Sequence, residues 1–126
     1  MSINNVKNEI NISDTVIDFL KSKDIFKNDE IHFVTGKQQR PSRTKLILVN
    51  TLFAMQDEDD NEIIGSLNVN IQDEDTIWIE YIGEILNLFL DESIIGNYRL
   101  EFTNEHLFKV SKDLYFKNLK FKFTSI

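Results

Sequence analysis

The feature that most constrains the fold is an apolar run in the middle of the chain, residues 44–55 (TKLILVNTLFAM). Its two alternating sets of side chains are both apolar: Leu46, Leu48 and Leu52, and Ile47, Val49 and Phe53. Such a run is typical of a strand that is covered on both faces, because successive side chains of a strand point to opposite sides. Residues 63–71 (IIGSLNVNI) follow after a polar connection, so the two segments are expected to pair as an antiparallel hairpin.

Two helices are expected, one on each side of this hairpin in the sequence. The first lies in the segment 12–25 and ends near Lys23, with Ser13 as its N-cap. The second covers Thr76 to Leu90, and Asp75 or Thr76 caps it. Two neighbouring apolar stripes run along the second helix: Ile77, Tyr81, Ile85 and Leu88, and Trp78, Ile82, Leu86 and Phe89. Together they predict a wide apolar face that packs on a sheet.

The remaining segments predict further strands. Residues 30–34 form a short strand candidate, and residues 98–103, 107–110 and 119–123 read as strands from their period-two alternation or composition. A chain of 126 residues with 41% hydrophobic residues can bury a real core in one domain. We therefore expect a single α+β domain over residues 1–126. It contains a mixed, mainly antiparallel sheet with two helices packed on it, and a long basic loop at about residues 35–45.

Composition excludes several classes of protein. The absence of cysteine removes disulfides, thiol nucleophiles and cysteine metal sites, and two histidines make a transition-metal enzyme improbable. A net charge of −7 disfavours general affinity for nucleic acid or anionic lipid. The first residues do not resemble a signal peptide, and no window approaches the roughly 18 apolar residues of a membrane helix. The chain is thus expected in a cytoplasm, or in a particle assembled there.

No catalytic, cofactor-binding or metal-binding residue is predicted. Glu80 and Glu84 are spaced as an acid–base pair could be, but a solvated helix face explains them better. A calcium loop that starts at Asp57 lacks glycine at its sixth position and glutamate at its twelfth. Gly36-Lys37 lacks the upstream glycine of a phosphate-binding loop, and neither histidine has a second ligand at metal-binding spacing.

Charge is segregated along the chain. Residues 57–92 contain twelve acids and no Lys or Arg, whereas residues 37–45 contain four basic residues and no acid. Either both blocks are solvated surface, or a basic loop on one copy meets an acidic tip on the next copy. On the second alternative, the predicted inter-subunit residues are Lys37, Arg40, Arg43, Lys45, Asp57, Glu58, Asp59 and Asp60.

Three segments in the middle of the chain resemble those of a known protein family. The segments that carry the resemblance are residues 48–52 (LVNTL), residues 65–71 (GSLNVNI) and the acidic run that precedes the helix at residue 76. They are similar to the tail-terminator or tail-completion family of tailed bacteriophages. The resemblance implies a mixed sheet with helices on one side and no catalytic activity. It also implies a homo-oligomeric ring at the head–tail junction that contacts portal or adaptor and tail proteins. DNA would pass through its lumen without specific binding.

Three functions are therefore weighed. The first is a non-enzymatic virion subunit of this kind, located in a virion that is assembled in the host bacterial cytoplasm. It needs no cofactor and no membrane. The alternative is an acidic inhibitor or DNA mimic that acts by protein–protein binding, motivated by the twelve-acid stretch. A small enzyme is the third, and no set of nucleophile, base and orienting group is readable for it.

Overall fold

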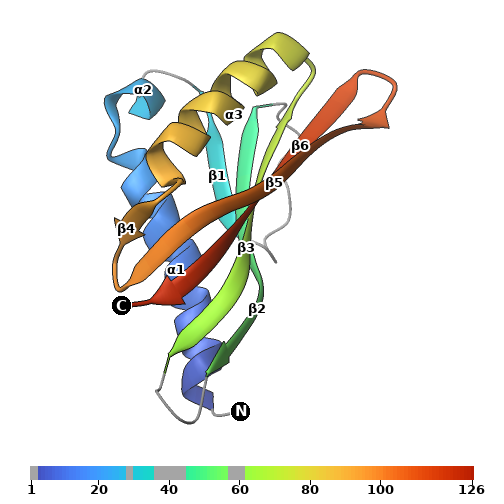
Figure 1. Ribbon diagram of the computed structural model, residues 1–126. Helices are drawn as coiled ribbons and strands as arrows, with labels where there is room; N and C mark the ends of the chain where they lie inside the picture. Colours follow the sequence, from blue (N-terminus) through green and yellow to red (C-terminus); the bar gives the residue numbers. More distant parts are fainter. Residues whose placement is uncertain (1–2, 28–29, 36–44, 57–61) are drawn as a thin grey trace.

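The computed structural model describes residues 3–27, 30–35, 45–56 and 62–126, with side chains from residue 12 onward. Within these residues the chain forms one six-stranded sheet and three helices (Figure 1). The strands are β1 (His32–Thr35), β2 (Leu46–Gln56), β3 (Ile63–Asp73), β4 (Ser93–Ile95), β5 (Tyr98–Ser111) and β6 (Leu114–Ser125). The helices are α1 (Ile3–Lys21), α2 (Asp24–Lys27) and α3 (Thr76–Leu90).

The strand order in the sheet is β1-β2-β3-β6-β5-β4. β1 pairs with β2 in parallel, and all other neighbours pair antiparallel. Two long hairpins, β2–β3 and β5–β6, therefore form the centre of the sheet, since β3 pairs with β6 along both strands. This is an α+β fold built on one mixed sheet, as the sequence predicted, with a third, short helix that the sequence did not predict.

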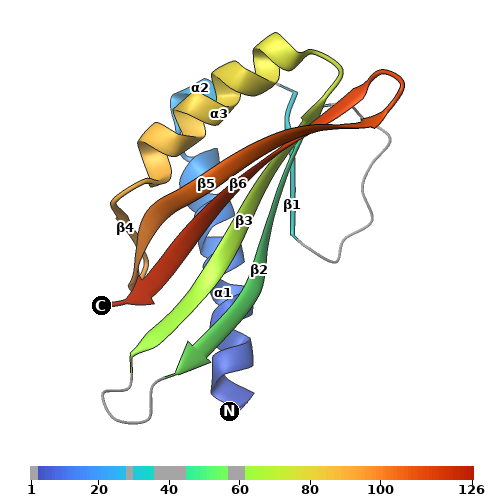
Figure 2. The ribbon, with the colours of Figure 1, turned by 45° about the vertical axis from the view of Figure 1, so that its right-hand side comes forward.

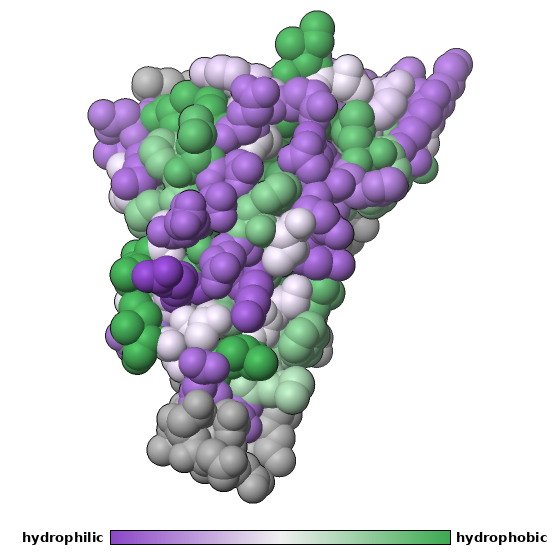
Figure 3. Space-filling view, viewed as in Figure 1, coloured by the Kyte–Doolittle hydropathy of each residue, from purple (hydrophilic) through white to green (hydrophobic). Residues whose placement is uncertain are grey.

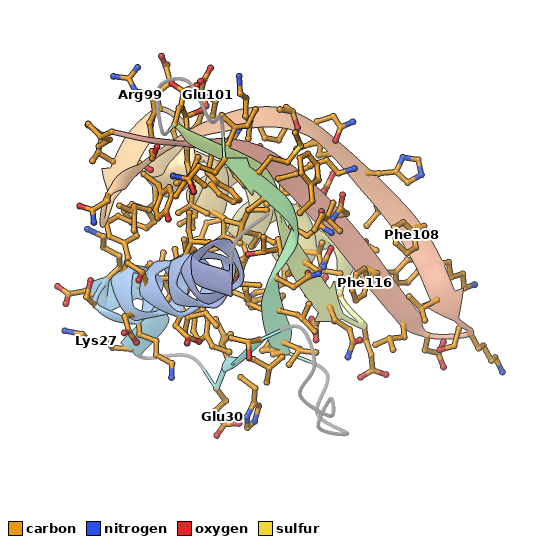
Figure 4. The ribbon with its side chains drawn as sticks, turned by 90° about the horizontal axis from the view of Figure 1, so that it is seen from below. Lys27, Glu30, Arg99, Glu101, Phe108 and Phe116 are labelled. Atoms are coloured by element: carbon orange, nitrogen blue, oxygen red, sulfur yellow. The ribbon has the colours of Figure 1, made fainter. Side chains whose placement is uncertain are left out.

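The helices lie together on one face of the sheet, which curls around α1 (Figures 2 and 4). The core lies between these layers because every second strand residue points toward the helices. The fully buried strand residues that face the helices are Ile47, Val49, Leu67, Val69, Ile71, Leu100, Leu119, Phe121 and Phe123. They pack against Ile12, Val16 and Leu20 of α1 and against Ile79, Ile82 and Leu86 of α3.

The predicted β2–β3 hairpin is confirmed, but a bulge changes the alternation within β2. The register shifts between Thr51 and Phe53, so Ala54 pairs with Gly65 and joins the core. Phe53 is thereby turned to the other face, away from Ile47 and Val49, with which the sequence had grouped it. The first half of β2 is covered on both faces, whereas Leu52, Phe53 and Met55 are exposed.

The start of the first helix is predicted wrongly. The helix begins at Ile3, and Ser13 lies in its middle, where its hydroxyl is 2.9 Å from the Thr51 hydroxyl on β2. Ser13 is buried, so it ties the helix to the sheet and does not cap it. The strands expected at 98–103 and 107–110 are one strand, β5, interrupted by a bulge between Phe102 and Asn104.

Candidate interaction surfaces

The predicted inter-subunit residues fall mostly outside the described part of the chain. Lys37, Arg40 and Arg43, and all four acidic residues from 57 to 60, belong to segments that the structure does not describe. Lys45 is described, and it faces its own chain. Its Nζ lies 3.7 Å from Oδ2 of Asp73 and 4.3 Å from the centre of the Trp78 ring. The contact predicted between these blocks therefore stays a prediction.

A buried lysine holds α3 to the β5–β6 hairpin. Lys117 on β6 is 6% exposed, and its Nζ donates to Oε1 of Glu80 on α3 and to Oε1 of Glu105 on β5, the latter at 3.2 Å. Burial alone lowers the pKa of Lys117, but the hydrogen bonds and charges of the two carboxylates outweigh it and leave the pKa raised. Glu80 is thus an ion-pair partner in the fold, which removes it from the acid–base pairing considered with Glu84.

Space for the Lys117 side chain comes from Gly83, which lies on the sheet-facing side of α3. A Cβ at Gly83 would lie 3.3 Å from Cδ and Cε of Lys117 and 3.6 Å from Cδ1 of Ile71. The aliphatic part of the lysine therefore packs under the helix while its ammonium group reaches the carboxylates at the side. This arrangement fixes the orientation of α3 on the sheet.

The orientation of α3 leaves part of its apolar surface uncovered. Asp75 caps the helix as predicted, and its Oδ1 accepts from the backbone N–H of Ile77 at 2.9 Å and of Trp78 at 3.3 Å. The sheet covers the side that carries Ile79, Ile82 and Leu86. Of the predicted stripe, Ile85 packs against the core, but Ile77 is 81% exposed, Tyr81 53% and Leu88 82%, so the expectation that these three pack on the sheet is wrong. A hydrophobic surface marks the first turn of α3 at the top of Figure 3.

The face of the sheet that points away from α1 and α3 is here called the outer face. At its centre an amide cluster joins β3 to β6. The Nδ2 of Asn118 donates to Oδ1 of Asn68 at 3.1 Å and to Oδ1 of Asn70 at 2.7 Å. Asn50 on β2 lies opposite Asn68 and extends this polar row across three strands. The asparagines of the LVNTL and NVN segments thus lie on a shared face, which their alternation in the sequence allows but does not specify.

One end of the outer face combines apolar and basic side chains. The register places Phe53, Ser66, Lys122 and Glu101 in one row across β2, β3, β6 and β5. The next row contains Met55, Ile64, Thr124 and Arg99. Figure 4 shows Arg99 and Glu101 pointing away from α1. We call Phe53, Met55, Ile64, Arg99, Lys120 and Lys122 the apolar–cationic patch.

Within the described residues the structure offers little that could support catalysis. No three side chains of the His, Asp or Glu type cluster as metal ligands there. A hollow of about 360 Å³ lies between α1 and β1, lined by Asp14, Ile17, Asp18, Lys21, Phe33 and Thr35. Its charged groups lie on successive turns of one helix, which is typical of a solvated helix face. None of the described helices is both long and apolar enough to span a bilayer.

Comparison with known proteins gives a fold but no family. No family model and no curated protein sequence matches the chain. The fold is similar to that of a chain in a virion. That chain belongs to the structure of the virion of a native gene transfer agent (GTA) particle, and the TM-score is 0.69. The match covers 90% of this chain and 93% of the other chain, at 10% sequence identity. Because so little sequence is shared, the likeness establishes a common fold and leaves activity and partners open.

Proposed function

We propose that this chain is a non-enzymatic structural subunit of a phage or phage-like virion. The observation that carries the proposal is the match to a virion chain over nearly the full length of both chains. A match over 90% of this chain and 93% of the other is more than a shared motif. The described surface is consistent with assembly, since it exposes apolar side chains on both α3 and the outer face.

The finer proposal is a ring of copies at the junction of head and tail, next to portal or adaptor and tail proteins. The resemblance of residues 48–52 and 65–71 to tail-terminator or tail-completion proteins supports this location. The separation of acidic and basic blocks along the sequence supports a head-to-tail contact, which closes into a ring when the rotation between copies permits. DNA would pass through such a ring without specific binding, in keeping with a net charge of −7.

The test is the composition and structure of purified particles that carry this gene. We expect mass spectrometry to detect the chain in particles, and cryo-electron microscopy to show it as a ring at the neck. Particles made without the gene should contain heads and tails that remain unjoined or incomplete. Particles of normal composition and infectivity that lack the chain would refute the structural role. A chain found elsewhere in the particle would refute only the location.

A further inference from the structure

The outer stripe of α3 (Ile77, Tyr81 and Leu88) is apolar and strongly exposed, which is typical of a surface that binds a partner. At 3.6 residues per turn these three residues and Glu84 fall within an arc of about 60°. The core residues Ile79, Ile82, Leu86 and Leu90 occupy the opposite arc. A helix that is apolar on opposite sides is normally buried on both. The sheet of the same chain covers one side only, and the second side needs another partner.

The charge around the stripe specifies the partner further. α3 contains Glu80 and Glu84 and no basic residue. Glu80 is paired with Lys117, whereas Glu84 makes no ion pair within the described part of the chain. The partner should therefore bring apolar side chains bordered by cations, because charge complementarity fixes register and excludes wrong partners.

The apolar–cationic patch has these properties. Phe53 is 50% exposed and Met55 55% exposed, and both lie on β2 at one side of the patch. Arg99, Lys120 and Lys122 lie on β5 and β6 at the other side. None of the three cations makes an ion pair among the described residues, although Glu101 lies opposite Lys122 on the neighbouring strand. The patch itself thus contains three cations, and its rows contain one carboxylate, Glu101.

The two surfaces also agree in size. The stripe from Ile77 to Leu88 extends about 16 Å along the helix, at 1.5 Å per residue. From β2 to β5 the patch spans three strand spacings, or about 14 Å. A helix that covers the free face of a sheet is a common layer arrangement, so a helix of one copy on the sheet of another requires no unusual packing.

The surfaces cannot meet within one molecule, because they point to opposite sides of the sheet. Figure 2 looks onto the outer face, with α1 behind the strands. From this we infer that the outer stripe of α3 in one copy binds the apolar–cationic patch of a second copy. The contact is heterologous, so each copy keeps one free stripe and one free patch until the assembly closes. The inference rests on the proposed function, because it names the residues through which copies would contact one another in the proposed ring.

The experiment measures self-association of the full chain by sedimentation velocity over a concentration series. Glu84→Lys and Lys122→Glu should each weaken association about tenfold or more, because each places like charges in the contact. The double variant should recover association, since it exchanges the two charges. Leu88→Ser should weaken association as well, and thermal unfolding followed by circular dichroism should show that its fold is kept. Raising the salt concentration should weaken the wild-type assembly.

Two matched variants serve as controls. Asp18→Lys makes the same charge change as Glu84→Lys at an exposed position of α1, and it should leave association unchanged. Lys112→Glu makes the same change as Lys122→Glu in the turn between β5 and β6, near the exposed apolar residues Leu107, Phe108 and Val110 of β5. Loss of association with Lys112→Glu but not with Lys122→Glu would place the contact at that turn and overturn the inference.

The association experiment can fail while the proposed virion role holds, and the reverse is also true. Assembly that is insensitive to Glu84→Lys, Lys122→Glu and Leu88→Ser refutes this contact, while the virion role is decided by the composition of particles. A wild-type chain that stays monomeric at every concentration also refutes the contact, whether or not particles contain the chain. Recovery in the double variant is the result that no general loss of folding or solubility would produce.

Discussion

The side chain of the buried Lys117 has an aliphatic part and a charged part, and the contribution of each to the stability of the fold can be measured. Its aliphatic chain packs under Gly83 of α3, and its ammonium group donates to Glu80 and Glu105. We compare Lys117→Met, which keeps a long flexible side chain and removes the charge, with Lys117→Ala, which removes both. The question is whether packing or ion pairing contributes more to the free energy of unfolding.

The expected magnitudes follow from the burial of the three side chains. Lys117→Ala removes three buried methylene groups at about 0.8 kcal/mol each, so packing alone costs roughly 2–3 kcal/mol. The side chains of Glu80 and Glu105 are 53% and 48% exposed, so water solvates them again once the ammonium group is gone. Each such pair contributes about 1 kcal/mol or less, and removing the cost of burying the ammonium group offsets that loss. Lys117→Met should therefore remain within about 1 kcal/mol of the wild type.

The assay is urea unfolding at low protein concentration, where self-association does not contribute, repeated from neutral to alkaline pH. The pKa of Lys117 is raised in the folded chain, so its stabilising contribution is complete below the unfolded pKa and is lost as pH rises through the folded pKa. Burial raises the pKa of Tyr98, so stability falls above the unfolded tyrosine pKa in every variant. The alkaline loss specific to Lys117 is the additional loss that wild type shows and Lys117→Met does not.

The reasoning is refuted if Lys117→Met unfolds as easily as Lys117→Ala. That result would mean that the charged hydrogen bonds, and not the packed methylene groups, hold α3 to β6. The variant Glu80→Gln then decides between the two carboxylates, because it keeps a hydrogen-bond acceptor while it removes one charge.

Three further substitutions test individual contacts through the free energy of unfolding in urea. Asp75→Ala removes the N-cap of α3 and should cost about 1 kcal/mol, whereas Asp75→Asn should retain most of the stability. Gly65→Ala should cost about 2 kcal/mol or more, because its Cβ would fall on the backbone carbonyl of Phe53 and the ring of Phe123; a neutral result would show that β2 yields at its bulge. Asn118→Ala should cost about 1–3 kcal/mol, since it leaves the side-chain oxygen of the buried Asn70 without its donor. Asn118→Asp has a side chain of the same shape but also lacks the donor. An equal loss of stability in Asn118→Asp would therefore contradict a role of Asn118 in packing alone.

The sequence predicted the local elements well wherever side chains determine them directly. α3 spans Thr76–Leu90 as expected, because an acidic cap and a long helical apolar pattern agree there. The hairpin of β2 and β3 follows from two apolar runs on either side of a polar connection. The extension of α1 back to Ile3 was missed because Ser13 was taken as an N-cap, although Ile3, Val6 and Ile10 continue the helical spacing upstream. The bulge in β2 has no glycine signal of its own; the nearest glycine, Gly65, lies on the partner strand opposite Ala54, where no side chain fits.

The candidate site was harder to predict, because the position of a charge along the chain does not determine the face on which it lies. The lysines of residues 109–122 form one basic block in sequence, yet the pleat separates them. Lys117 turns inward and is neutralised by two carboxylates, whereas Lys120 and Lys122 turn to the outer face beside the apolar end of β2. The exposure of the α3 stripe could not be predicted either. A helix with apolar residues on opposite sides and a helix with one wide apolar face have similar sequence patterns, and only the contact with the sheet distinguishes them. The proposed contact surfaces thus depend on strand register and helix orientation, and charge reversal at Glu84 and Lys122 tests both at once.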